Sequence, residues 1–134
     1  MATIFTKIIN GSIPSTKLYE DDKCIVILDI APCHKGHALV IPKKECETII
    51  DCDDNILQHL IVIAKKIAKK QVKELKCDGY NIIINNKLAS GQEVPHLHIH
   101  IVPRYNNDEY KMDFGHEEYQ DNEIKDFGKR LNIC

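Results

Sequence analysis

The chain lacks tryptophan, lacks any Cys-x-x-Cys pair, and has no apolar run long enough to cross a membrane. Its longest apolar runs, such as residues 25–28, are far shorter than the roughly 20 residues of a membrane span. No basic segment followed by an apolar stretch opens the sequence, so we expect a cytoplasmic protein without a membrane anchor. The formal net charge is only -2, which indicates no nucleic-acid partner.

The cysteines stand at irregular spacing, and we expect them to be free thiols that mostly fill the core. They are Cys24, Cys33, Cys46, Cys52, Cys77 and Cys134. A chain of 134 residues can bury a hydrophobic core without disulfides or a structural metal. The length therefore predicts one domain over residues 1–134, with its core at 3–104 and a polar tail at 105–134.

Apolar residues recur at intervals of three and four over residues 55–76, which predicts a long amphipathic helix. Asp53 favours the beginning of this helix, and Gly79 favours its end. Short helices are expected at residues 3–9 and 123–131.

Runs of β-branched and apolar residues, separated by turn-forming residues, predict five strands. These runs are residues 17–20, 24–30, 37–41, 80–85 and 94–102. The strands are grouped around the long helix instead of alternating with helices. This order favours an α+β fold with a five-stranded antiparallel sheet.

Three histidines, His96, His98 and His100, alternate with aliphatic residues in the last predicted strand. Because successive side chains of a strand point to opposite faces, the imidazoles should share one face while the aliphatic residues face the core. A half-exposed strand that uses histidine for its polar face is the plain structural alternative. Histidine is a poor routine choice there, so the row indicates a function.

A metal site is another alternative, since two histidines of a strand can offer nitrogens to one zinc ion. Alternate strand residues lie roughly 6.7 Å apart, which puts His96 and His100 about 13 Å apart at the backbone, too far for all three to bind one ion comfortably. Nucleophilic attack on phosphorus by a neutral imidazole suits the row better. His98 is the natural nucleophile because it has a same-face neighbour on each side.

Residues 96–102 fit the pattern His-φ-His-φ-His-φ-φ, with φ apolar, and the chain resembles the histidine triad (HIT) family. The likeness to its histidine triad nucleotide-binding branch runs from about Thr3 to Arg104. It includes Ile4-Phe5, Lys7-Ile8-Ile9, Ile13-Pro14, Glu20-Asp21-Asp22 and Leu39-Val40-Ile41-Pro42-Lys43-Lys44.

The resemblance implies a nucleotide hydrolase or transferase that cleaves purine nucleoside phosphoramidates, in which AMP is bonded to an amine. His98 would form a covalent nucleotidyl intermediate, from which water releases AMP. His100 would contact the phosphate, whereas His96 and the upstream His37 would orient the nucleophile. Hydrolysis of dinucleoside polyphosphates, or a nucleotide-binding partner module with incidental turnover, are the alternatives.

The same resemblance implies a nucleotide-binding site and a homodimer with one continuous sheet. Asp29 would accept hydrogen bonds from the ribose hydroxyls, and Asn85 with the backbone of Gly91 and Gln92 would contact the phosphate. Four apolar residues would sandwich the purine base: Phe5, Ile8, Ile13 and Leu39.

The chain departs from the family pattern in three places. Glu93 stands where the nucleotide-binding branch has a hydroxyl residue, and a carboxylate beside phosphate is repelled unless it is protonated or turned away. Thr3, Thr6 and Glu45 replace residues that hold a structural zinc in some members. We therefore expect no metal and no cofactor. The tail after Arg104 does not match and lacks the tryptophan of that branch.

Overall fold

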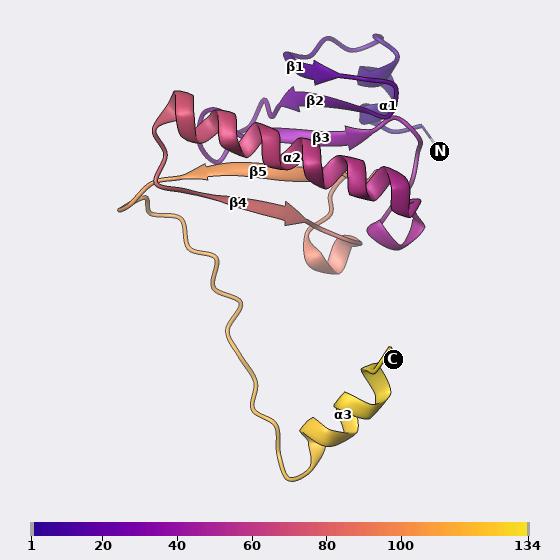
Figure 1. The fold of residues 1–134 in the computed structure, drawn as a ribbon, viewed down its shortest axis with the longest axis vertical. Coiled ribbons are helices and arrows are strands. Elements are labelled where there is room, and N and C mark those ends of the chain that lie inside the picture. The colour runs from indigo at the N-terminus through magenta and orange to yellow at the C-terminus, as the bar shows by residue number, and fades with distance from the viewer. Residues whose placement is uncertain (1, 134) are drawn as a thin grey trace.

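The structure, a computed structural model, describes residues 2–133. Its strands are β1 (Lys17–Glu20), β2 (Cys24–Leu28), β3 (Ala38–Pro42), β4 (Gly79–Ile84) and β5 (Ile99–Arg104). Its helices are α1 (Ile4–Ile9), α2 (Asp54–Leu75) and α3 (Glu123–Leu131), with the short 3-10 helices η1 (Ile49–Asp51) and η2 (Leu88–Ser90). Figure 1 shows α2 lying along the sheet and α3 standing apart from it.

All neighbouring strands are antiparallel, and their order in the sheet is β1-β2-β3-β5-β4. The last strand of the chain, β5, therefore lies inside the sheet, between β3 and β4. The predicted α+β fold with a five-stranded antiparallel sheet, one long helix and short helices is confirmed.

The two faces of the sheet pack against different helices. Because side chains alternate along a strand, Val26 of β2 joins the core that contains the buried residues of α2. Its neighbours Ile25 and Ile27 join a second core with Phe5 of α1. The short helix α1 covers only part of its face, so the rest of that face is open to a ligand.

The long helix α2 follows its predicted range closely, with Asp53 as the N-cap. It ends earlier than expected because Lys76 adopts a left-handed backbone, with φ 56°. Gly79, which we expected just beyond the helix, instead opens β4. The predicted helices at residues 3–9 and 123–131 correspond to α1 and α3.

The prediction of a strand over residues 94–102 is wrong at its beginning, because β5 starts only at Ile99. β3 and β5 pair with Val40 opposite Ile99, so continued pairing would bring Leu97 opposite Pro42. Proline has no N–H to donate to the ladder, and β3 ends there. The N–H of Leu97 instead donates to the carbonyl of Cys46 at 2.8 Å.

The five cysteines within residues 2–133 are free thiols. Cys24, Cys52 and Cys77 are buried, whereas Cys33 is exposed, so the expectation that cysteines mostly fill the core holds for these three. Cys134 lies outside the described residues. Among residues 2–133, no helix combines the length and apolar character that a bilayer span requires.

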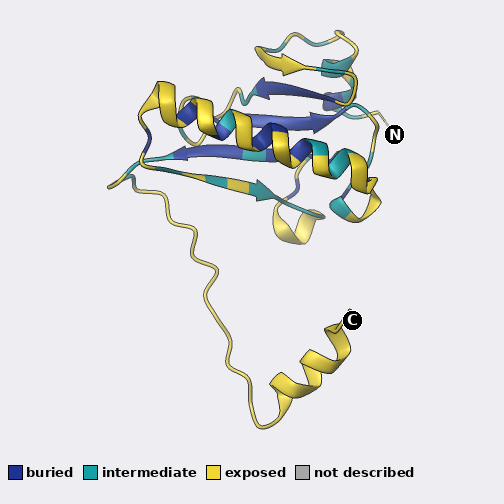
Figure 2. Cartoon of the chain, viewed as in Figure 1, coloured by how far each residue is buried: buried dark blue, intermediate teal, exposed yellow. Residues whose placement is uncertain are grey.

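The tail beyond Arg104 leaves the sheet as an extended chain and ends in α3 (Figure 2). Its first residues are fixed to β5, because Arg104 forms a two-point ion pair with Asp108 and donates to the carbonyl of Tyr110. From residue 109 to residue 133 every side chain is exposed.

Leu60 and Ile61 of α2 give a matched test of the α2-side core. Leu60 is fully buried, at 0% exposure, whereas Ile61 is 44% exposed. Leu60→Ala should lower the free energy of unfolding by about 2–5 kcal/mol because it leaves a cavity. Ile61→Ala should lower it by less than about 1 kcal/mol. Urea unfolding followed by circular dichroism measures both, and equal losses would contradict the packing described above.

Candidate active site

A cavity of about 450 Å³ opens on the face of the sheet that carries α1. This size suits a small-molecule ligand. Ten of the thirteen residues predicted for the site line it: Phe5, Ile8, Ile13, Asp29, Leu39, Asn85, Gly91, Glu93, His98 and His100. The other three, His37, His96 and Gln92, are buried and do not line the cavity.

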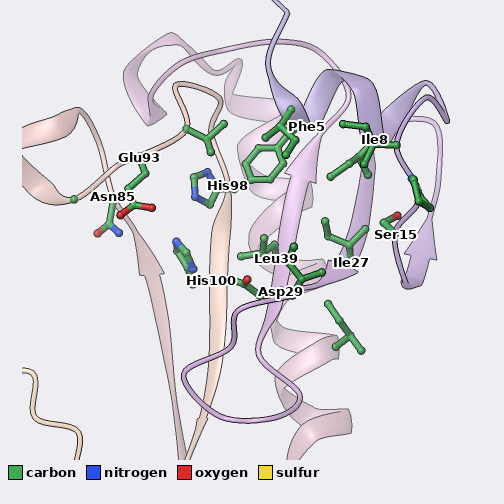
Figure 3. A pocket seen from close by; sticks show the side chains of 17 residues that line it. Phe5, Ile8, Ser15, Ile27, Asp29, Leu39, Asn85, Glu93, His98 and His100 are labelled. Carbon is green, nitrogen blue, oxygen red and sulfur yellow. The ribbon is translucent and has the colours of Figure 1, made fainter.

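The cavity is apolar at one end and polar at the other (Figure 3). Phe5 and Ile8 of α1 and Leu39 of β3 belong to the apolar end, where Leu39 packs in the same cluster as Phe5. His98 and His100 stand at the polar end, with their ring centroids 4.8 Å apart. Such a gradient fits a ligand that has a flat apolar part and a charged part.

His98 is held in one tautomer by its own backbone. Its Nδ1 lies 2.7 Å from the carbonyl oxygen of His96. A carbonyl oxygen only accepts, so Nδ1 carries the hydrogen and Nε2 of the neutral ring keeps a lone pair. That lone pair has no hydrogen-bond partner within the described residues, which leaves it free to act as a nucleophile.

His37 fixes the opposite tautomer in His100. The backbone N–H of Cys33 donates to Nδ1 of His37 at 3.2 Å, so neutral His37 carries its hydrogen on Nε2. This N–H donates to Nδ1 of His100 at 3.0 Å. His100 therefore carries its own hydrogen on Nε2 and can donate it to a ligand in the cavity.

The ring of His96 anchors the segment behind the cavity. Its Nε2 donates to the carbonyl of Pro42 at 2.9 Å, and its Nδ1 lies 3.2 Å from the hydroxyl of Thr3. Thr3 also caps α1, so this bond ties the helix to the histidine segment. The part of His96 that contacts His98 is its backbone carbonyl, not its imidazole.

Burial keeps the histidines of the cavity neutral. Desolvation lowers the pKa of His98 below its ordinary value and outweighs the hydrogen bond to His96. Burial first, and then the like charges of His98 and His37, lower the pKa of His100 to about 4. Desolvation also lowers the pKa of His37. All three rings are therefore neutral near pH 7, as the tautomers described above require.

Asp29 lies where the apolar and polar ends meet, beside His100 (Figure 3). Its Oδ1 accepts from the backbone N–H of Ala31 at 2.9 Å, which fixes the carboxylate. Its Oδ2 lies 3.8 Å from Nε2 of His37.

The loop after β4 forms the wall beside Glu93. Gly91 has φ 101°, a left-handed backbone that favours glycine, and a Cβ added there would lie 3.8 Å from the amide of Asn85. Gln92 is buried, and the phosphate contact expected of its backbone stays a prediction. Its N–H donates to the carbonyl of Lys87, and its buried side chain bonds to the backbone of Lys87 and Glu47. Gln92 thus holds the loop instead of facing the cavity.

Several residues that line the cavity were not predicted from the sequence. They are Ile4, Pro14, Ser15, Ile27, Leu28, Ile30 and Val94. Ile27 pairs with Leu39 across β2 and β3. Because paired residues point to the same face of a sheet, the prediction that Leu39 lines the site could have identified Ile27 as well. Ser15 follows Pro14 in a loop and has no comparable pattern.

Two groups of side chains within residues 2–133 have metal-ligating atoms close together. Asp29, His37 and His100 form one, and their ligand atoms lie within 4.8 Å of one another. The other consists of Asp21, Cys24 and His59. In the first, a metal would have to replace the His37–His100 hydrogen bond.

Thr3, Thr6 and Glu45, which the resemblance aligns with the zinc ligands of some family members, lie in a region where side chains form hydrogen bonds with one another. The hydroxyl of Thr6 donates to Glu45 at 2.6 Å, and Thr3 contacts His96. Two threonine hydroxyls are weaker ligands for zinc than two thiolates. The absence of a metal stays a prediction.

Two imidazoles with fixed tautomers, His98 and His100, therefore stand at the polar end of a cavity that could hold a small molecule. The HIT domain matches residues 10–107. The chain belongs to the HIT family, and the predicted membership is confirmed.

Three curated relatives show the range of similarity. An uncharacterized HIT-like protein of Methanocaldococcus jannaschii is 47% identical over 112 residues, covering 84% of this chain and 86% of that protein. The adenosine 5'-monophosphoramidase hnt1 of Schizosaccharomyces pombe is 37% identical, covering 98% and 97%. The adenylylsulfatase HINT3 of Arabidopsis thaliana is 40% identical, covering 78% of this chain and 53% of that protein.

Two crystal structures match nearly the whole chain. The protein SMU.412c of Streptococcus mutans is 38% identical, with a TM-score of 0.89, covering 96% of this chain and 82% of that one. A HIT family protein of Bacillus subtilis is 34% identical, with a TM-score of 0.90, covering 98% and 95%.

The lowered pKa values predict how the site titrates. His98 should be less than half protonated at pH 6.5, where a free histidine is half protonated, and His100 should titrate near pH 4. Nitrogen NMR of the imidazole rings measures protonation and tautomer together. His98 should show hydrogen on Nδ1, and His100 should show it on Nε2. A protonated His98 at pH 6.5 would contradict the assignment.

Proposed function

We propose that this protein hydrolyses purine nucleotides at the α-phosphorus, with phosphoramidates of AMP as its preferred substrates. The observation that carries the proposal is the pair of fixed tautomers at the polar end of the cavity. His98 offers a lone pair on Nε2, and His100 offers an N–H beside it. Mere binding of a nucleotide does not require a histidine with an unpaired nitrogen.

In the proposed reaction, Nε2 of His98 attacks the α-phosphorus as the phosphorus–nitrogen bond breaks. The amine leaves with a proton from solvent at the polar end, and the later attack of water returns one proton to solvent, so that Glu93 stays a carboxylate throughout. The N–H of His100 donates to a phosphate oxygen, and the carbonyl of His96 supports the positive ring of His98. Water then attacks phosphorus, AMP departs, and His98 regains its neutral form.

The rest of the cavity suits an adenosine group. The apolar end, with Phe5, Ile8, Ile13 and Leu39, would hold the base. Asp29 keeps Oδ2 for the ribose hydroxyls while Oδ1 is bonded to Ala31. The relatives in S. pombe and A. thaliana are named as an adenosine 5'-monophosphoramidase and an adenylylsulfatase. Both names imply a substrate that contains an adenosine 5'-phosphoryl group.

The charge of the cavity favours a phosphoramidate over a dinucleoside polyphosphate. Its lining residues, all in the described part of the chain, include two carboxylates, Asp29 and Glu93, and no lysine or arginine. A polyphosphate brings several negative charges that this lining cannot neutralise. A phosphoramidate brings only the charge of its α-phosphate.

A cytoplasmic location stays a prediction.

His98→Ala should reduce the release of AMP from adenosine 5'-phosphoramidate by at least about a thousand-fold, because the nucleophile is lost. Chromatography of the nucleotide product measures the rate. His116→Ala, in the exposed tail, is the matched control and should turn over as the parent does.

Intact-mass spectrometry of acid-quenched protein gives a second measurement of the same step. It should find an AMP adduct on the parent protein and none on His98→Ala. Equal turnover by parent and His98→Ala would show that the proposed nucleophile is wrong.

Glu93 provides a test of leaving-group charge. Glu93→Gln should raise kcat/KM for diadenosine tetraphosphate, relative to adenosine 5'-phosphoramidate, by roughly 3- to 10-fold, because a repulsive charge is removed from a partly solvated site. Glu117→Gln makes the same change of charge in the exposed tail and should leave this ratio unchanged. A ratio that moves equally in both variants would assign the preference to net charge and not to Glu93.

A further inference from the structure

The loop between β2 and β3 influences where His100 carries its hydrogen. The N–H of Cys33 in this loop donates to Nδ1 of His37 at 3.2 Å, and His37 then donates to His100. Among residues 30–35, all of them described, only His34 is not exposed. An exposed loop keeps one position only where something holds it. The place of the Cys33 N–H therefore depends largely on the side-chain contacts of His34.

His34 is held by the segment that follows β5. Its Nε2 donates to Oδ2 of Asp108 at 3.0 Å, since a carboxylate only accepts. The rings of Tyr105 and Tyr110 meet its imidazole edge to face, with centroids 5.2 and 4.9 Å away. The loop and the end of β5 lie at the same end of the sheet, where β3 begins (Figure 1). His34 thus joins the loop to the first residues of the tail.

Asp108 is a buried carboxylate with several donors. Its side chain is only 7% exposed. It accepts from Nε and Nη2 of Arg104 at 2.8 and 2.7 Å, and from the backbone N–H of Tyr105 at 3.1 Å. The guanidinium of Arg104 holds the pKa of this carboxyl well below its usual range, so Asp108 is charged at neutral pH. Charge-assisted hydrogen bonds of this kind are short and strong, and they give His34 a fixed acceptor.

The rings of His37 and His100 are held together from the side of α2. The side-chain amide of Gln71 donates to the carbonyls of Gly36 and Ile101, each at 3.0 Å. Gly36 precedes His37 in the chain, and Ile101 follows His100. The two rings should therefore stay side by side when the contact with the tail is lost, while the loop before them moves.

We propose that Asp108 is a positioning residue of this site, acting through His34 on the loop in which Cys33 donates to His37. Without that N–H, His37 can adopt its other tautomer, in which Nε2 accepts instead of donating. His100 then carries its hydrogen on Nδ1 and loses the N–H that it offers to a ligand. Asp108 is not among the residues that line the cavity. Its effect on turnover rests on the proposed function, whereas its effect on the tautomers does not.

Nitrogen NMR of the imidazole rings tests the tautomers directly. In His34→Ala and in Asp108→Ala, His100 should show hydrogen on both ring nitrogens, whereas the parent should show it on Nε2. His34→Gln keeps a side-chain N–H for Asp108 and should restore much of the parent's tautomer. Asp113→Ala removes an exposed carboxylate of the same tail, one that accepts from the N–H of Gly115, and should change nothing. Urea unfolding checks that each variant is folded. An unchanged His100 tautomer in both folded alanine variants would overturn the proposal.

Release of AMP from adenosine 5'-phosphoramidate tests whether the two residues act through one contact. His34→Ala and Asp108→Ala should each lower kcat/KM by roughly 10-fold, because fewer molecules have the N–H of His100 available. The double variant should lose no more than about 2-fold beyond either single variant. Losses that multiply to roughly 100-fold would overturn the proposal that Asp108 acts through His34. A parent protein that released no AMP would refute the proposed reaction, while the His100 tautomers would still decide the role of Asp108.

Discussion

The hydrogen bond from Nδ1 of His98 to the carbonyl oxygen of His96 is the interaction on which the rest of the site depends. It decides which nitrogen of the central ring carries hydrogen, and so which nitrogen can attack. The bond exists because residues 94–98 leave the regular ladder, where carbonyls are otherwise used between strands. The irregular backbone before β5 is thus part of the active arrangement.

Pro42 contributes to this arrangement in two ways, although it is not among the residues that line the cavity. It ends β3, which stops the pairing of β5 at Ile99, and its carbonyl then accepts from the ring of His96. Thr3 holds the other nitrogen of that ring while it caps α1. Two distant segments therefore fix His96, and His96 fixes His98. The site is rigid because several parts of the fold converge behind it.

Local sequence patterns predicted much of this structure. The features that they did not predict depend on contacts between segments far apart in the sequence. The three- and four-residue spacing over residues 55–76 predicted α2, since a helix depends on neighbours in sequence. The start of β5 depends on its pairing with a strand about sixty residues upstream, which alternation alone does not reveal. The contact of His37 with His100 has the same origin, and only the family resemblance pointed to it. The bond from the side chain of Gln92 to the backbone of Glu47 was not predictable either, because the neighbours of Gln92 in sequence do not show it.

The mutual influence of the histidines bears on how the proposed site would hold a phosphate without lysine or arginine in its wall. Charge on His98 or His37 lowers the pKa of His100, and charge on His98 lowers the pKa of His37, so the cluster disfavours more than one positive charge at a time. In the proposed reaction that charge belongs to His98 while it is bonded to phosphorus. In that reaction His100 would stay neutral and keep the single N–H with which it would donate to the phosphate. A permanent cation would bind substrate and transition state alike, whereas a charge that appears on His98 during the reaction acts mainly on the transition state.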